Sequence, residues 1–175
     1  MIVLRMNAGL RARLIPALAA VALLAGCARD DEAAMRARLG QWFALGETLA
    51  FGAGPDCAAG AFRLVDMQVK AAMPVSDSVA DLSRSLPRRG IAALNDPDVA
   101  PDAAMIGLAN SDRALGMGMR RVALEARACM GGMTESAFRY ALANPAAVLA
   151  WEAETGTLML ADPRTRVLVV AMGAG

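Results

Sequence analysis

The chain has 175 residues, of which 57% are hydrophobic and 4% aromatic, with 18 basic and 17 acidic residues. A net charge of +1 argues against nucleic-acid binding, which requires a clustered basic surface. The absence of histidine excludes Ser-His-Asp and Cys-His nucleophiles and histidine metal centres. Phosphate-binding glycine motifs are also missing, so the composition predicts a protein without catalytic residues or a cofactor.

The first 27 residues have the pattern of an exported protein. Three arginines precede an apolar run over residues 14–24, and this run has about half of the ~20 residues needed to span a bilayer. Small residues follow it and lead directly to a cysteine, in the order Leu24, Ala25, Gly26 and Cys27. A cleaved signal peptide fits this pattern better than a permanent transmembrane helix.

Residues 24–27 resemble the lipobox of bacterial membrane lipoproteins. The resemblance implies cleavage before Cys27, attachment of a diacylglyceryl group to its thiol, and acylation of the new amino terminus. In Gram-negative members an aspartate after this cysteine typically retains the protein in the inner membrane, and here that residue is Ala28. The resemblance therefore implies an outer-membrane anchor facing the periplasm. The alternative is a cysteine that follows an ordinary secretory signal by chance.

The chain then divides into a signal peptide over 1–26, a lipidated cysteine with a short tether over 27–31, and one periplasmic domain over 32–175. Removal of the signal peptide leaves 149 residues with a net charge of −2. Two cysteines remain beside the lipidated one, Cys57 and Cys129. In an oxidising compartment they are expected to form a disulfide. Free thiols and a redox pair are the alternatives, although C-x-x-C spacing is absent.

In the first half of the domain, apolar residues at three- and four-residue steps predict an amphipathic N-terminal helix from Glu32 to about Phe51. Partial alternation over 61–69 predicts a strand, although a short helix fits nearly as well. Ser78 is positioned to cap a short helix that Pro87 ends. Residues 87–100 are rich in turn-forming residues.

In the second half, one long central helix is predicted from Pro101 to Met130, with Cys129 on its buried face. Its glycines leave a break near 110–116 as an alternative. A further helix follows, and three strands then form a meander over 148–152, 157–161 and 166–171. The expected fold class is α+β: an amphipathic N-terminal helix, one long central helix and short helices packed on a small antiparallel sheet.

Arg113, Arg120, Arg121 and Arg127 form a basic stripe opposite the apolar face of the predicted long helix. Such a stripe fits anionic lipid headgroups or an acidic envelope protein. A solvated face of an arginine-rich protein explains it equally well.

Two patterns in the sequence resemble metal sites but do not match them. A copper(I) site would use thioethers with the cysteine between them, and a calcium loop would use aspartates, but the spacings do not fit. The residues concerned are Met117, Met119, Cys129, Met130 and Met133 for copper, and Asp96, Asp98 and Asp102 for calcium. The sequence thus predicts a non-catalytic accessory or interaction module. The alternatives are a lipoprotein that binds a small apolar ligand between helices and sheet and, third, a carboxylate-based cell-wall hydrolase.

Overall fold

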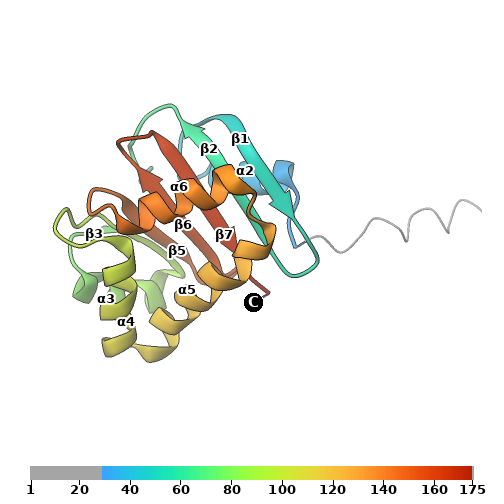
Figure 1. Cartoon of the computed structure of the whole chain (residues 1–175). Coiled ribbons are helices and arrows are strands. Elements are labelled where there is room, and N and C mark those ends of the chain that lie inside the picture. The colour runs from blue at the N-terminus through green and yellow to red at the C-terminus, as the bar shows by residue number, and fades with distance from the viewer. Residues whose placement is uncertain (1–28, 175) are drawn as a thin grey trace, which may run out of the picture.

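The computed structural model describes residues 29–174, so the predicted signal peptide and Cys27 lie outside the described residues. Helices surround one seven-stranded mixed sheet, which confirms the α+β prediction at this level (Figure 1). The elements in chain order are α2 (Glu32–Leu39), β1 (Leu45–Ala53), β2 (Ala58–Leu64), β3 (Val75–Ser76), α3 (Val79–Arg89), β4 (Ile91–Leu94), α4 (Pro101–Ser111), α5 (Arg113–Glu125), the 3₁₀ helix η2 (Ala126–Cys129), α6 (Gly132–Ala143), β5 (Val148–Glu152), β6 (Thr157–Asp162) and β7 (Val167–Met172).

The strands lie in the order β1-β2-β7-β6-β5-β4-β3. Only β3 and β4 pair in parallel, and the other neighbours are antiparallel. The predicted meander is present as β5, β6 and β7, within a residue of its expected bounds. It forms the middle of a larger sheet, however, so the prediction of a small antiparallel sheet was wrong. Of the other strands, β2 was predicted, whereas β1 comes from a segment read as helix and β4 from a segment read as turns.

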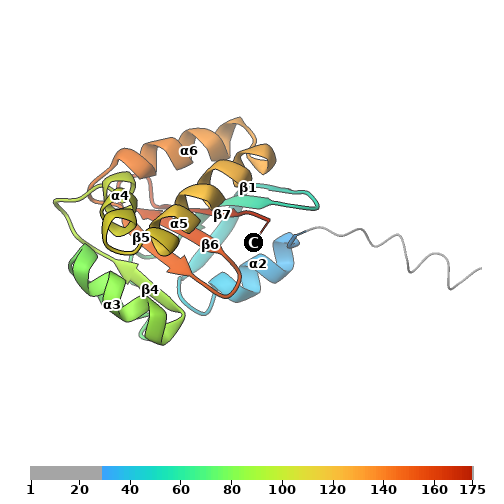
Figure 2. The same cartoon turned by 90° about the horizontal axis from the view of Figure 1, so that it is seen from below.

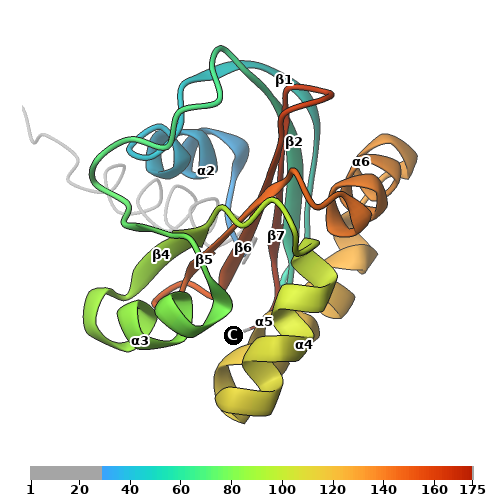
Figure 3. The same ribbon diagram turned by 90° about the vertical axis from the view of Figure 1, so that its left-hand side faces the viewer.

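The sheet, seen edge-on in Figure 3, has helices on both sides. It separates two clusters of buried apolar side chains. On one face, α4, α5 and α6 cover side chains such as Trp151, Leu158 and Val169. On the other face, α2 covers side chains that include Phe62 and Met159. Because both faces are covered, β7 is buried along its whole length, which suits its continuous apolar run.

The N-terminal helix is much shorter than predicted. The structure has a helix over Glu32–Leu39, and the segment 45–53 assigned to the same helix forms β1. Gly54 and Pro55 belong to the turn that joins β1 to β2. Pairing with β2 satisfies the backbone of β1, and this tertiary contact outweighs an ambiguous apolar spacing.

The long central helix is also corrected, because it is divided into α4, α5 and η2. Asp112 separates α4 from α5 in an extended conformation, and its carboxylate accepts a hydrogen bond from the Leu115 N–H at 3.1 Å. At Gly116 a side chain would place its Cβ 2.2 Å from the Ala109 nitrogen, so glycine permits close packing of the two helices. The break therefore lies in the region that the glycines had marked.

The middle of the chain combines a confirmed cap with two missed strands. Ser78 caps α3 as predicted and accepts a hydrogen bond from the Asp81 N–H. Pro87 lies inside α3, which continues to Gly90, a residue with a φ of 71° that ends the helix. The strand predicted over 61–69 is present as β2 but ends at Leu64. The segment read as turns contains β4, and β3 was also missed.

Candidate interaction surface

The helical layer is fastened to the sheet by the predicted disulfide between Cys57 and Cys129. The bond is present, with a Cα–Cα distance of 5.9 Å between residues 72 positions apart. It joins the end of the β1–β2 turn to η2, rather than to a continuous long helix. The disulfide therefore positions the chain directly after α5, including Arg127.

A cavity of about 340 Å³ opens on the outer side of the helical layer, between α4, α5 with η2, and α6. Its lining combines apolar side chains with arginines from two helices. The lining contains three arginines and one carboxylate, and its residues are Asp102, Met105, Arg120, Ala123, Leu124, Arg127, Phe138, Arg139 and Leu142. The cavity is thus amphipathic and predominantly basic.

Three of the four arginines of the predicted stripe lie at this cavity or at the groove beside it. Arg120 and Arg127 line the cavity, and Arg121 lines an adjoining shallow groove with Met117 and Leu124. Arg113 begins α5 and lines neither hollow. Arg120 and Leu124 are shared by both hollows and lie between them.

Two of the arginines are held by neighbouring carboxylates. Arg127 forms an ion pair with Glu135 of α6 at 2.6 Å, and Arg121 pairs with Glu125 at 3.7 Å. All four side chains are substantially exposed, so these pairs orient the guanidinium groups more than they stabilise the fold.

Sequence reasoning missed Arg139, which completes the basic lining from α6. It is exposed on its own helix and shows no local pattern. Only the packing of α6 beside α5 places it with Arg120 and Arg127.

The same layer carries most of the exposed large apolar side chains among residues 29–174. Five of the seven lie on α4, α5 and α6, with exposed fractions between 41% and 67%. They are Ile106, Met117, Leu124, Met133 and Tyr140, whereas Val65 and Val75 lie elsewhere. Apolar groups that gather on one surface and are rimmed by charge are typical of an interaction site.

A second hollow beside α3 contains Asp77 and Asp81. A hydrogen bond from the Ser78 hydroxyl, and then the Arg84 guanidinium, hold the pKa of Asp81 below its usual range. A lowered pKa keeps this carboxylate ionised, whereas the acid of a glycoside hydrolase needs a raised pKa. Asp81 therefore acts as the capping partner of Ser78. The helical cavity contains Asp102 as its single lining carboxylate.

The residues of the rejected copper pattern diverge in space. Met119 is fully buried in the core, whereas Met117 is 49% exposed on the outer side of α5. In the described part of the chain, no group of three or more histidine, cysteine or acidic residues could hold a metal ion. None of the helices over residues 29–174 is long and apolar enough to cross a membrane.

The chain matches no known protein family, and no similar curated protein or solved structure was found.

Proposed function

We propose that this protein is a lipid-anchored accessory module on the periplasmic face of the outer membrane, and that its helical layer docks another envelope protein. The observation that carries the docking part is the coincidence, on one layer, of an arginine-lined cavity and exposed apolar side chains. The lipid anchor is supported by the lipobox at residues 24–27.

The chemistry of the surface specifies the kind of partner. Arg120 and Arg139 offer planar guanidinium groups that suit carboxylates. Leu124, which is 67% exposed, offers an apolar contact beside them. A segment with acidic residues and one apolar side chain would match both, with the apolar group entering the cavity. Arginine and large apolar groups are the side chains that commonly dominate binding energy at protein interfaces.

Photo-crosslinking in the native envelope tests this proposal. A benzoylphenylalanine at Leu124 is expected to give a discrete protein adduct in intact cells. The matched control is the same residue at Val65, which is also exposed but lies in the loop after β2. Adding Arg120→Glu and Arg139→Glu should abolish the adduct at 124, because the carboxylates would repel an acidic partner. Equal adducts from both positions, or adducts with phospholipid alone, would contradict the proposal.

A small-ligand-binding lipoprotein is the second candidate, because the cavity volume of about 340 Å³ lies at the lower end of the range for ligand pockets. The cavity opens outward between helices, rather than between helices and sheet as the sequence suggested. Its arginines favour an anionic amphipathic molecule over a purely apolar one. Native mass spectrometry of the protein purified from membranes would reveal such a ligand as a constant added mass that Arg139→Glu removes.

A further inference from the structure

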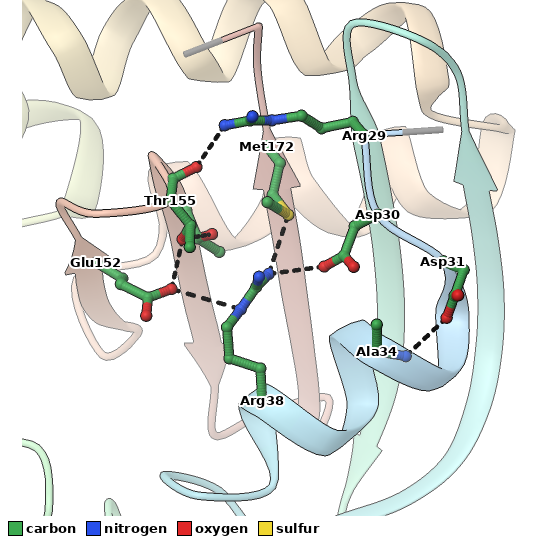
Figure 4. Close-up of polar contacts among 9 residues, drawn as sticks. Arg29, Asp30, Asp31, Ala34, Arg38, Glu152, Thr155 and Met172 are labelled. Carbon is green, nitrogen blue, oxygen red and sulfur yellow. Dashed lines mark hydrogen bonds and ion pairs between the residues drawn. The ribbon is translucent and has the colours of Figure 1, made fainter. Parts of the chain in front are cut away.

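The start of the described chain is held against two turns of the sheet. The Arg29 N–H donates to the Gly54 carbonyl at 2.8 Å. The Arg29 guanidinium donates to the Thr155 carbonyl at 2.8 Å (Figure 4). Gly54 belongs to the β1–β2 turn and Thr155 to the β5–β6 turn. Two independent contacts therefore determine where the chain enters the domain.

An ion cluster secures the next residues. Arg38, near the end of α2, extends back toward the start of the helix and pairs with Asp30 at 2.9 Å and with Glu152 of β5 at 3.4 Å. The Thr155 hydroxyl donates a further hydrogen bond to Glu152. The three charged side chains are only 11–21% exposed, so salt screens these pairs less than it screens surface pairs. The entry segment is thus clamped rather than loosely attached.

The clamp lies at one end of the sheet. Its strand residues belong to a single row of cross-strand neighbours, which runs through Ala53, Ala58, Met172, Thr157 and Glu152. At this end lie the β1–β2 turn, the β5–β6 turn and the residues after β7. They are joined there by η2, which the disulfide bonds to the β1–β2 turn, and by the junction of α3 with β4 beside Glu152. Figure 2 shows the β1–β2 turn and the C-terminus on one side of the molecule, with α3 and α4 on the other.

We infer that this end of the sheet lies against the phospholipid surface, with the turns over 54–57 and 153–156 at the level of the headgroups. The inference rests on the proposed lipid anchor at Cys27. Only Ala28 separates Cys27 from Arg29, which limits the Cα–Cα distance between the cysteine and the clamp to about 7 Å. A lipid so close to a clamped residue gives the domain one orientation. Asp56 and Glu154 are exposed in these turns, so the contact is with headgroups and the turns do not insert.

This orientation has a consequence for the helical layer. α5 and α6 run beside the sheet (Figure 1). The arginine-lined cavity lies between these helices and α4, and therefore on the flank of the domain. The cavity then stays accessible to a partner in the periplasm while the domain rests on the membrane.

Fluorescence quenching in vesicles tests the orientation with two matched variants of the full-length lipidated protein. Asp56→Trp marks the β1–β2 turn, and Asp98→Trp marks the loop before α4. Asp56 and Asp98 are both exposed. The vesicles contain phosphatidylcholine with or without bromine on the acyl chains near the headgroup, and the signal of wild-type protein is subtracted. The added fluorescence of Asp56→Trp should fall by about twofold in brominated vesicles, because a residue at the headgroup boundary lies close to the brominated carbons. That of Asp98→Trp should stay unchanged.

A lengthened tether provides the control for the clamp. Twelve glycine and serine residues inserted between Ala28 and Arg29 would span about 19 Å and release the domain from the surface. Quenching of Asp56→Trp should then be lost while the protein still floats with the vesicles. Flotation with equal quenching at both positions, with quenching at Asp98→Trp alone, or with none at either position would overturn the orientation but leave the lipid anchor intact. If the protein with the original tether does not float with the vesicles, the proposed anchor is overturned, and the orientation with it.

Discussion

Asp162 shows how one buried carboxylate organises a turn. It is 1% exposed and accepts hydrogen bonds from the Asn144 amide at 2.7 Å and from the Thr165 hydroxyl at 2.6 Å. It also accepts from the backbone N–H groups of Arg164 and Thr165, at the start of the β6–β7 turn. These bonds satisfy a charge that would be costly to bury alone. They also connect the turn to the loop between α6 and β5.

Asp162→Ala should lower the free energy of unfolding by about 1 to 3 kcal/mol, because it leaves the buried Asn144 amide without its partner. The control is Asp66→Ala, which removes a single exposed bond to the Gln68 N–H and should change stability by less than about 0.5 kcal/mol. Urea unfolding followed by circular dichroism measures both. Equal losses would show that the buried network contributes nothing beyond an ordinary turn.

At the scale of elements, the close contact between α4 and α5 depends on Gly116. A Cβ at this position would lie 2.2 Å from the Ala109 nitrogen and 2.7 Å from the Met105 carbonyl oxygen. Both atoms are backbone, so the helices themselves would have to move apart. A Cβ added at Gly118, two positions further along α5, would have no neighbouring atom within 4 Å.

Gly116→Ala should therefore destabilise the domain by about 1 to 3 kcal/mol through overpacking. Gly118→Ala should stabilise it by up to about 1 kcal/mol, because alanine is the better helix former and meets no obstacle. Thermal unfolding measures both effects: the melting temperature should fall below that of wild type for Gly116→Ala and rise above it for Gly118→Ala. Two shifts in the same direction would contradict the packing argument.

The disulfide connects two elements that are distant in the chain, the β1–β2 turn and η2. Cys57→Ser should cost about 2 to 5 kcal/mol of unfolding free energy, the usual loss for a native bridge. Cys129→Ser should cost about the same, and the double variant little more, because each single change breaks the same bond. Chemical denaturation under non-reducing conditions makes the comparison. Additive losses would mean that the thiols contribute separately and that the bridge is not the source of the stability.

For the whole molecule, the anchor is the prediction with the widest consequences. Cys27→Ala should abolish both acylation and cleavage at this site, since the cysteine thiol is the expected acceptor of the lipid. Palmitate labelling in a bacterial host and the mass of the mature amino terminus measure the two events. Cys57→Ser is the matched control and should keep the label. A wild-type protein that is unlabelled and cut elsewhere would end the lipoprotein interpretation.

Local signals identified those features whose causes act over a few residues. Ser78 was placed correctly because a cap needs only a hydroxyl and the next helical turn. The meander strands were located because turn-forming residues bracket short apolar runs, as with the turn before Arg166. The pairing of Cys57 with Cys129 followed because no other cysteine outside the lipobox was present to compete.

Part of the interaction surface was also readable from the sequence. Arg120 and Arg127 share a helical face because they are seven residues apart, and this spacing survives the division of the helix. Arg139 could not be assigned to the same place, since its position depends on how α6 packs beside α5. The cavity itself arises from that packing and has no counterpart along the chain.

The sequence by itself determined the α+β class, the cysteine pair and the strands bounded by strong turns, and its lipobox predicts export and lipidation. Only the tertiary structure decided that residues 45–53 form β1, that Asp112 divides the central helix, and that the meander occupies the middle of a seven-stranded sheet. The physical reason is how far apart along the chain the interacting groups lie. Caps and turns are satisfied within a few residues, whereas strand pairing and close helix contacts depend on groups that are distant along the chain.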